Sequence, residues 1–243
     1  MKASNDFAER RTLLRGISGL GLSLTTIGVL DPCKSARALN TASIAGDDAH
    51  RKLHTMNEFV IWRRLDRPGH DAVLLKSTEE GWLLSGSAVF NHDAGPACID
   101  YTVAVDHLWN SRRGTVKGFI AGKTFSHVIT RASDGWYLND TLIKGLEYLR
   151  DIDYGFTPAT NVLQLRRVAI PLGKAVDLPV VWFDAEATTL IELPQRYERL
   201  NETAYRYSAP TVGYRGELEL LSQNGFVKTY PHLWATETST DPS

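Results

Sequence analysis

The amino-acid sequence predicts a mainly β fold, in which a single curved antiparallel sheet forms a roll or an incomplete barrel with few short helices. Three tight turns, at residues 76–81, 133–135 and 223–225, separate apolar runs and end in glycine. Two of them contain Asp-Gly or Asn-Gly, which tolerate the positive φ of type I′ hairpin turns. Few stretches show the 3.6-residue apolar period of a helix. A sheet of this length must curl or close to hide its edges and its apolar face, so we expect an internal cavity.

The individual strands follow from these turns and from the alternation of side chains. The turns are flanked by six expected strands, at residues 72–75, 82–90, 125–131, 136–138, 217–221 and 226–230. Between the first two hairpins, Ile99, Tyr101, Val103 and Val105 alternate with more polar residues, so one face of that strand is buried and the other is wet. Residues 142–152 fit a short helix or a strand, and residues 39–54 fit a flexible leader or a helix.

The N-terminal residues 1–38 are typical of a twin-arginine signal peptide. Arg10 and Arg11 precede Leu13, Leu14 and Arg15, and an apolar run from 16 to 30 follows. Ala-Arg-Ala at 36–38 fits cleavage after residue 38. The sequence therefore predicts the twin-arginine export machinery as a partner, and a periplasmic or extracellular location for the mature protein.

Three other interpretations of this segment meet specific objections. The apolar run falls short of the roughly 18 to 20 residues that span a bilayer, so no permanent membrane anchor is expected. Asp31 and Pro32 stand where a lipoprotein signal needs small residues before Cys33. A cytoplasmic protein with an inert N-terminal helix would require a misplaced start codon or a segment without function.

The remaining chain is long enough for one domain with a sizeable core. We expect a leader at 39–56, the domain at 57–234 and a disordered tail at 235–243, which is small and polar. Removing residues 1–38 takes the formal net charge from −1 to about −4, which argues against nucleic acid as a partner. Cys98 would then be the only cysteine, and a small buried apolar side chain is its expected role.

The sequence contains no catalytic motif. It has no G-x-S-x-G, no phosphate-binding glycine loop, no H-E-x-x-H and no Cys-x-x-Cys. The pairs His70-Asp71 and His92-Asp93 lie next to turn residues, and sequence neighbours on a strand point to opposite faces. We therefore predict a protein that is not an enzyme, with no cofactor and no bound metal.

Asp151 and Asp153 stand two residues apart, which on a strand places both carboxylates on one face. An antiparallel return strand over residues 162–170 would bring Arg166 and Arg167 close to them, together with the neighbouring Arg150, and so favours ion pairing. Ligand recognition and acid–base catalysis remain as alternatives for the two carboxylates.

Five segments resemble a known family. They are DYGFTPATN at 153–161, LPQRY at 193–197, YPHLW at 230–234, and the longer runs at 59–75 and 88–106. Taken together they resemble a glycolipid-binding family of bacterial proteins that was once filed as a domain of unknown function. The resemblance covers nearly all of residues 57–234. It implies a spiral β-roll similar in shape to bacterial lipoprotein carriers, a lipid or glycolipid ligand, and no agreed catalytic residues.

The candidate ligand-binding residues combine planar hydrogen-bonding groups with aromatic platforms for a sugar head. They are Trp62, Arg63, Asp153, Asn161, Arg166, Gln195, Arg196 and Tyr197. Each also has an ordinary structural interpretation as a core, turn or ion-paired residue.

Two functions from different classes follow. The first is a non-catalytic binding or carrier protein for a lipid-like amphiphile in the cell envelope, which predicts a large apolar cavity. The alternative is an envelope hydrolase or lyase acting on a saccharide or lipid head, which predicts that Asp151 and Asp153, or Asp66 and Asp71, converge in a cleft. A scaffold role without a small ligand is a third possibility.

Overall fold

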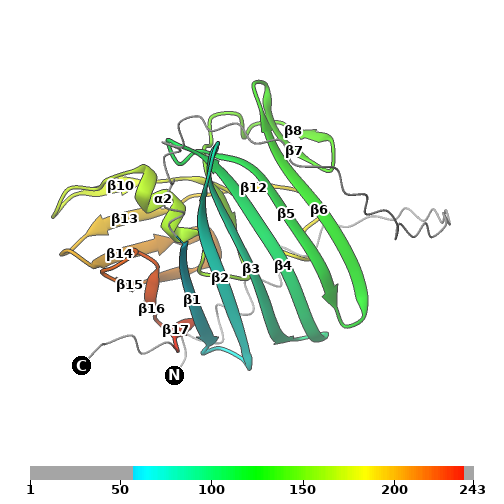
Figure 1. Ribbon diagram of the computed structural model, residues 1–243, viewed down its shortest axis with the longest axis horizontal. Helices are drawn as coiled ribbons and strands as arrows, with labels where there is room; N and C mark the ends of the chain where they lie inside the picture. Colours follow the sequence, from blue (N-terminus) through cyan, green and yellow to red (C-terminus); the bar gives the residue numbers. More distant parts are fainter. Residues whose placement is uncertain (1–56, 238–243) are drawn as a thin grey trace, which may run out of the picture.

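The computed structural model describes residues 57–237, which form one large sheet and a smaller inner layer (Figure 1). The predicted signal peptide at 1–38, the leader at 39–56 and residues 238–243 lie outside the described residues. The large sheet has 14 antiparallel strands and does not close into a barrel. The predicted mainly β fold with one curved antiparallel sheet is therefore confirmed.

The first half of the large sheet is a meander of long strands followed by two short ones. Its strands are β1 (Asn57–Arg64), β2 (Gly69–Thr78), β3 (Gly81–His92), β4 (Gly95–Asp106), β5 (Ser111–Ile120), β6 (Lys123–Ala132), β7 (Gly135–Leu138) and β8 (Thr141–Ile143). Each pairs with the next in the chain, and the predicted turns at 76–81 and 133–135 are hairpins. Residues 142–152, which fitted either a helix or a strand, contain the end of β8, turns and the start of β9.

The second half of the sheet returns to β1 and so bends the whole structure into a roll. Its strands are β10 (Ala175–Asp177), β13 (Arg196–Arg199), β14 (Ala204–Ala209), β15 (Tyr214–Leu220), β16 (Val227–Tyr230) and β17 (Trp234–Thr236), with the 3-10 helix η1 (Pro210–Val212) before β15. Strand β17 pairs with β1 and thereby joins the two halves. Strand β17 includes Ala235 and Thr236, so these two residues of the predicted tail belong to the sheet.

The inner layer consists of three short strands and one helix. The strands β9 (Ile152–Tyr154), β11 (Val180–Phe183) and β12 (Ile191–Leu193) form a second sheet, in which β9 runs parallel to β11. The helix α2 (Asn161–Arg167) occupies the segment for which a return strand at 162–170 was predicted. That prediction was wrong, because Val162 and Leu163 are buried as neighbours on a helix turn rather than on alternating faces.

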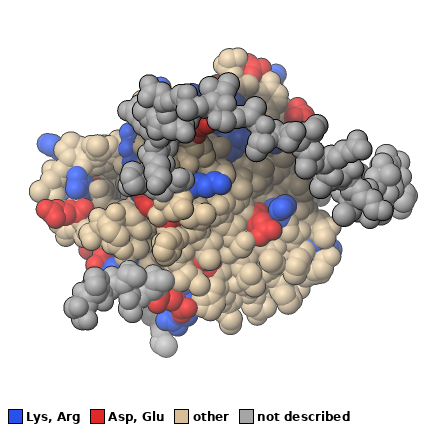
Figure 2. Space-filling model, viewed as in Figure 1, with Lys and Arg blue, Asp and Glu red and all other residues tan. Residues whose placement is uncertain are grey.

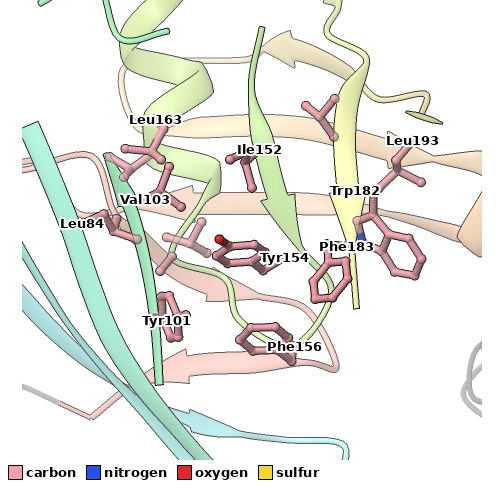
Figure 3. Packing of buried hydrophobic residues seen from close by; sticks show 14 of the residues in the cluster. Leu84, Tyr101, Val103, Ile152, Tyr154, Phe156, Leu163, Trp182, Phe183 and Leu193 are labelled. Atoms are coloured by element: carbon pink, nitrogen blue, oxygen red, sulfur yellow. The ribbon is translucent and has the colours of Figure 1, made fainter. Parts of the chain in front are cut away.

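This inner layer fills the space that the sequence predicted as a cavity. Figure 3 shows Leu84, Tyr101 and Val103 of the large sheet facing Ile152, Tyr154 and Phe183 of the inner strands. Tyr101, Tyr154 and Phe156 pack as neighbouring rings with centroids 5.4–5.9 Å apart. The core is therefore a filled interior of aromatic and aliphatic side chains.

The long strands expose their other face, as the alternation in β4 predicted. Ile99, Tyr101, Val103 and Val105 are buried, and the intervening residues are partly or fully exposed. Cys98 belongs to the second set and is only half-buried, so its predicted place in the core was wrong. Successive side chains of a strand point to opposite faces, and Cys98 directly precedes the inward-facing Ile99, so its side chain points outward.

Candidate functional site

Three of the segments that carry the family resemblance meet at one pocket of about 40 Å³ in the interior of the roll. Asp153 and Asn161 come from the first, Leu193 from the second, and Tyr230 and Trp234 from the third. We call this the polar–aromatic pocket and define it by six of its lining residues, namely Asp153, Asn161, Trp182, Tyr207, Tyr214 and Tyr230. Residues far apart in the chain thus build a single site.

The turn after β9 shapes one wall of the pocket. Gly155 donates its backbone N–H to the carbonyl of Phe183 over 3.0 Å, which continues the parallel pairing of β9 with β11. A Cβ atom at Gly155 would stand 2.7 Å from Cζ2 of Trp182 and 2.9 Å from a carboxylate oxygen of Asp184. Only glycine fits this close approach, which explains the residue between Tyr154 and Phe156.

Asp153 is held on two sides. Its carboxylate accepts hydrogen bonds from the hydroxyl of Thr160 and from Nε2 of Gln195, the latter at 2.6 Å. Thr160 precedes α2 and Gln195 precedes β13, so the carboxylate connects the inner strand to the helix and to the large sheet. Only 7% of Asp153 is exposed, and both partners are buried.

Asn161, Tyr197 and Gln164 form a second series of buried hydrogen bonds. Asn161 donates from Nδ2 to the hydroxyl of Tyr197 at 2.7 Å, and that hydroxyl donates to Oε1 of Gln164 at 3.3 Å. Two atoms in this region, Nε2 of Gln164 and Oε1 of Gln195, have no hydrogen-bond partner within the described residues. A buried amide is normally hydrogen-bonded, so these two atoms are available to a water molecule or a ligand.

Four tyrosines form one connected group, of which Tyr207, Tyr214 and Tyr230 line the pocket and Tyr197 contacts Tyr207. Ring centroids lie 4.7 Å apart for Tyr197 and Tyr207, 5.8 Å for Tyr207 and Tyr230, and 4.8 Å for Tyr214 and Tyr230. Burial raises the pKa of each hydroxyl above its usual range. The four side chains are therefore neutral and act as hydrogen-bonding groups and ring faces.

A further carboxylate supports the pocket from outside. Asp71 on β2 accepts hydrogen bonds from the hydroxyl of Tyr101, at 2.9 Å to Oδ2, and from the hydroxyl of Thr157, which lines the pocket. Burial raises the pKa of Asp71 to about 7. Asp71 does not itself line the pocket, so its role is to tie the pocket wall to the large sheet.

The structure brings together four of the eight predicted site residues, namely Asp153, Asn161, Gln195 and Tyr197. Gln164 and the tyrosines 207, 214 and 230 belong to the same network but were missed. Gln164 was missed because its segment was expected to be a strand, and the tyrosines because alternation along a strand does not show which residues meet across a sheet. Tyr230 could have been found, since it lies in one of the family segments.

The other four predicted site residues lie elsewhere. Trp62 is fully buried in the core and donates from Nε1 to the carbonyl of Val227 at 2.6 Å. Arg63 points outward to Glu237, with 3.1 Å between Nε and the carboxylate.

Arg166 and Arg196 are engaged in ion pairs outside the pocket. Arg166 pairs with Glu58, and its guanidinium carbon lies 4.9 Å from the ring centroid of Trp109. Arg196 is exposed and pairs with Asp177 at 2.8 Å. These two arginines therefore have the ordinary structural roles that their sequence context also allowed.

The carboxylates proposed as acid–base pairs bind separate partners. Asp151 is fully buried and pairs with Arg167 at 2.6 Å, which confirms the predicted ion pairing, although Arg167 approaches from a helix. Asp153 belongs to the network with Thr160. Asp66 binds Arg64 at 2.8 Å, whereas Asp71 binds Tyr101.

Two searches of residues 57–237 complete the description. No three His, Cys, Asp or Glu side chains in this range gather as a metal site would require. No helix in the same range is long and apolar enough to cross a bilayer.

The fold and the pocket define an open β-roll with a small polar and aromatic interior site. The chain belongs to the family described as "Putative glycolipid-binding", whose sequence profile matches residues 59–236. No curated protein matches the chain. The crystal structure of a DUF1089 family protein from Pseudomonas aeruginosa is similar, with a TM-score of 0.59 and 20% sequence identity. The similarity covers 68% of this chain and 91% of that one, and at this identity it shows the fold alone.

Proposed function

We propose that the protein is a non-catalytic binding or carrier protein for a lipid-like amphiphile with a hydroxyl-bearing head group, acting in the bacterial cell envelope. The observation that carries this proposal is the polar–aromatic pocket, in which the carboxylate of Asp153 and the amide of Asn161 face a group of tyrosines. Carboxylate and amide groups bind hydroxyls, and aromatic rings cover the apolar faces of sugars.

The charge of the pocket favours a neutral head group. Among the described residues that line it, Asp153 is the only one with a charged side chain. A phosphate or sulfate would be repelled by this buried carboxylate, whose field is poorly screened in the interior. A polyol donates hydroxyl protons to a carboxylate without that penalty.

The size of the pocket decides which part of the ligand can enter. About 40 Å³ is well below the roughly 150 Å³ of a cavity that accepts benzene. The pocket therefore admits a protruding polar group, and the acyl chain remains outside unless the wall at residues 155–160 moves. This differs from the large apolar cavity that the sequence led us to expect.

The arrangement of the carboxylates favours binding over the alternative hydrolase or lyase. Glycoside hydrolysis needs two carboxyl groups that flank one bond. Asp151 pairs with Arg167 and does not line the pocket, whereas Asp153 does. The pocket is therefore lined by one of the two carboxylates, not by both.

The proposal is tested by native mass spectrometry and lipid extraction of the protein purified from an export-competent bacterium. We expect an amphiphile that co-purifies and whose mass stays unchanged on incubation with the protein. Asp153→Asn should lower its occupancy about tenfold or more, since it removes a charged hydrogen-bond acceptor. Asp177→Asn, an exposed change on β10, is the matched control. A protein that stays free of ligand when envelope lipids are added would contradict the proposal.

We further propose export by the twin-arginine route, on the basis of Arg10 and Arg11. Replacing both with lysine should leave the protein in the cytoplasm, while the wild type should be found in the periplasm or the medium. Cell fractionation with antibody detection measures this. Equal distribution of the two proteins would exclude the route.

A further inference from the structure

A second and more apolar cavity lies beside the polar–aromatic pocket. It has a volume of about 250 Å³ and is lined by the helix α2, the start of β14 and the end of β15. We call it the helix groove and define it by its five apolar or aromatic lining residues, namely Val162, Leu165, Tyr205, Leu220 and Leu221. Val162, Tyr205 and Leu220 are buried, whereas Leu165 and Leu221 are half-buried. The groove therefore has an apolar floor that is reached from the surface.

The groove and the polar–aromatic pocket are built on the same two elements. Asn161 lines the pocket and Leu165 lines the groove, and residues four apart on a helix lie on the same side, about 5–6 Å from each other. On β14, Tyr207 lines the pocket and Tyr205 lines the groove. Both tyrosines are buried on the inner side of the sheet, and two residues of a strand span about 7 Å. A ligand whose head group enters the pocket therefore has the groove within a few bond lengths.

The backbone around the groove favours a hydrocarbon chain over a peptide. The backbone N–H groups of Thr203, Leu220, Leu221 and Gly225 all donate hydrogen bonds inside the protein. A peptide in the groove would leave its own backbone groups without partners on this side, which is costly in an apolar environment. An alkyl chain has no polar groups to satisfy.

The polar residues of the groove favour an uncharged chain. Glu202 and Ser222 are exposed, so they stand at the opening. Arg166 pairs with Glu58 and donates to the backbone carbonyl of Asn224, so its guanidinium is already engaged. The carboxylate of Glu202 would repel that of a free fatty acid. An alkyl chain that carries no charge meets neither obstacle.

Other parts of the surface suit an alkyl chain less well. A cavity of about 390 Å³ beside η1 is lined by three arginines and a glutamate, so an alkyl chain there would lie against charges. A cavity of about 30 Å³ behind Phe90 is smaller than the polar–aromatic pocket itself. Figure 2, which has the same view as Figure 1, shows no hollow over the visible described residues of β3–β5. The apolar enclosure that a chain needs is offered by the helix groove.

We propose that the helix groove binds the acyl chain of the amphiphile whose head group enters the polar–aromatic pocket. This inference rests on the function proposed above and adds the second part of the ligand site. A cavity of roughly 150 Å³ accepts the six carbons of benzene, so a groove of about 250 Å³ holds on the order of ten carbons. Carbons beyond that number extend out of the groove.

A series of n-alkyl β-glucosides, from butyl to dodecyl with one uncharged sugar head, tests this inference on the protein purified from an export-competent bacterium. Isothermal titration calorimetry, below the concentration at which each glucoside forms micelles, measures the affinities. The dissociation constant should fall about twofold to fourfold per added methylene up to about ten carbons and then level off. Leu165→Glu should weaken the binding of decyl glucoside at least tenfold more than that of butyl glucoside, because it places a charge in the groove.

The controls separate the groove from the head-group pocket. Leu221→Glu, on the sheet side of the groove, should act like Leu165→Glu and serves if circular dichroism shows that Leu165→Glu fails to fold. Leu172→Glu makes the same change at a residue that is 64% exposed and does not line the groove, so it should leave the whole series unchanged. Asp153→Asn should weaken every glucoside by a similar factor, because it acts on the head group.

Three results would contradict the inference, and they differ in what they leave standing. If affinity is independent of chain length while Asp153→Asn still weakens binding, the head-group pocket stands and the groove is overturned. If affinity rises with chain length equally in the wild type and in Leu165→Glu, the chain lies elsewhere and the groove is again overturned. If no glucoside of any length binds, both the groove and the proposed function are overturned.

Discussion

Tyr101 on β4 reaches across Gly86 on β3 to donate a hydrogen bond to Asp71 on β2. The side chain of Tyr101 lies directly over the glycine, since a Cβ atom at Gly86 would stand 2.4 Å from the phenol oxygen. Gly114 on β5 provides the same kind of space for Tyr154, whose hydroxyl donates to the carbonyl of Thr102 at 3.0 Å. Two glycines on the inner face therefore allow two large side chains to lie flat between the sheet and the inner layer.

Gly86→Ala tests this packing. The added methyl group would overlap the ring of Tyr101, and the backbone carbonyl of Ala72 lies only 2.8 Å away, so the sheet cannot yield easily. We expect the free energy of unfolding to fall by about 2–3 kcal/mol through overpacking. Denaturant unfolding measures it. Ser85→Ala on the outward side of the same strand is the control and should change stability by less than about 0.5 kcal/mol. Equal effects of the two changes would refute the role of Gly86.

Asp71 should make the stability of the protein depend on pH. Its pKa is raised from 3.8 to about 7 in the folded protein, mainly by burial. Between these two values the folded state binds a proton that the unfolded state has released. Stability should therefore be highest below about pH 4 with respect to this group, and should fall by up to about 4 kcal/mol as the pH rises to about 7.

Asp71→Asn separates this effect from that of other titrating groups. The variant cannot ionise at position 71, so its unfolding free energy should vary less between pH 4 and pH 7 than that of the wild type. Urea unfolding at several pH values measures the difference in slope. Parallel curves for the two proteins would show that Asp71 is ionised in the folded state.

Local patterns predicted the sheet well because they depend on neighbours in sequence. Hairpin turns and the alternation around Tyr101 identified the meander and its buried face. The inner layer was not predictable in the same way, because β9 pairs with β11, which lies almost thirty residues further along the chain. Parallel pairing over that separation leaves no local signal.

The candidate site was predicted only in part, because local patterns do not show which distant segments meet. Asp153 was found from its spacing with Asp151, and Asn161 and Tyr197 from their chemistry, whereas Gln164 was missed because it lies on a helix turn that was expected to be a strand. Arg63 and Arg196 were included for their chemistry. Whether these two side chains are exposed depends on which face of the sheet they point to, and residue type alone does not show that.

Removing only Arg167 from its buried ion pair with Asp151 should destabilise the folded protein strongly. Asp151 is fully buried, and Nε and Nη2 of Arg167 donate to both of its carboxylate oxygens. Arg167→Met leaves the carboxylate unpaired and should cost about 3–5 kcal/mol. Adding Asp151→Asn removes that charge and should recover more than half of the loss. A double-mutant cycle from urea unfolding checks this, and additive effects would disprove the coupling.

Gln164 can be tested for whether it contributes to ligand binding or to the free energy of unfolding. Its Oε1 accepts a weak 3.3 Å hydrogen bond from Tyr197, while its Nε2 has no partner within residues 57–237. Gln164→Met replaces an incompletely satisfied amide with an apolar side chain of similar length, so the unfolding free energy should change by less than about 1 kcal/mol. Asn161→Leu is the comparison. It removes a 2.7 Å bond to Tyr197 and should cost about 1–3 kcal/mol.

If the free amide of Gln164 binds the head group, the Met variant should nevertheless lose most of its co-purified amphiphile in native mass spectrometry. Retention of the ligand at wild-type occupancy would place Gln164 outside the site.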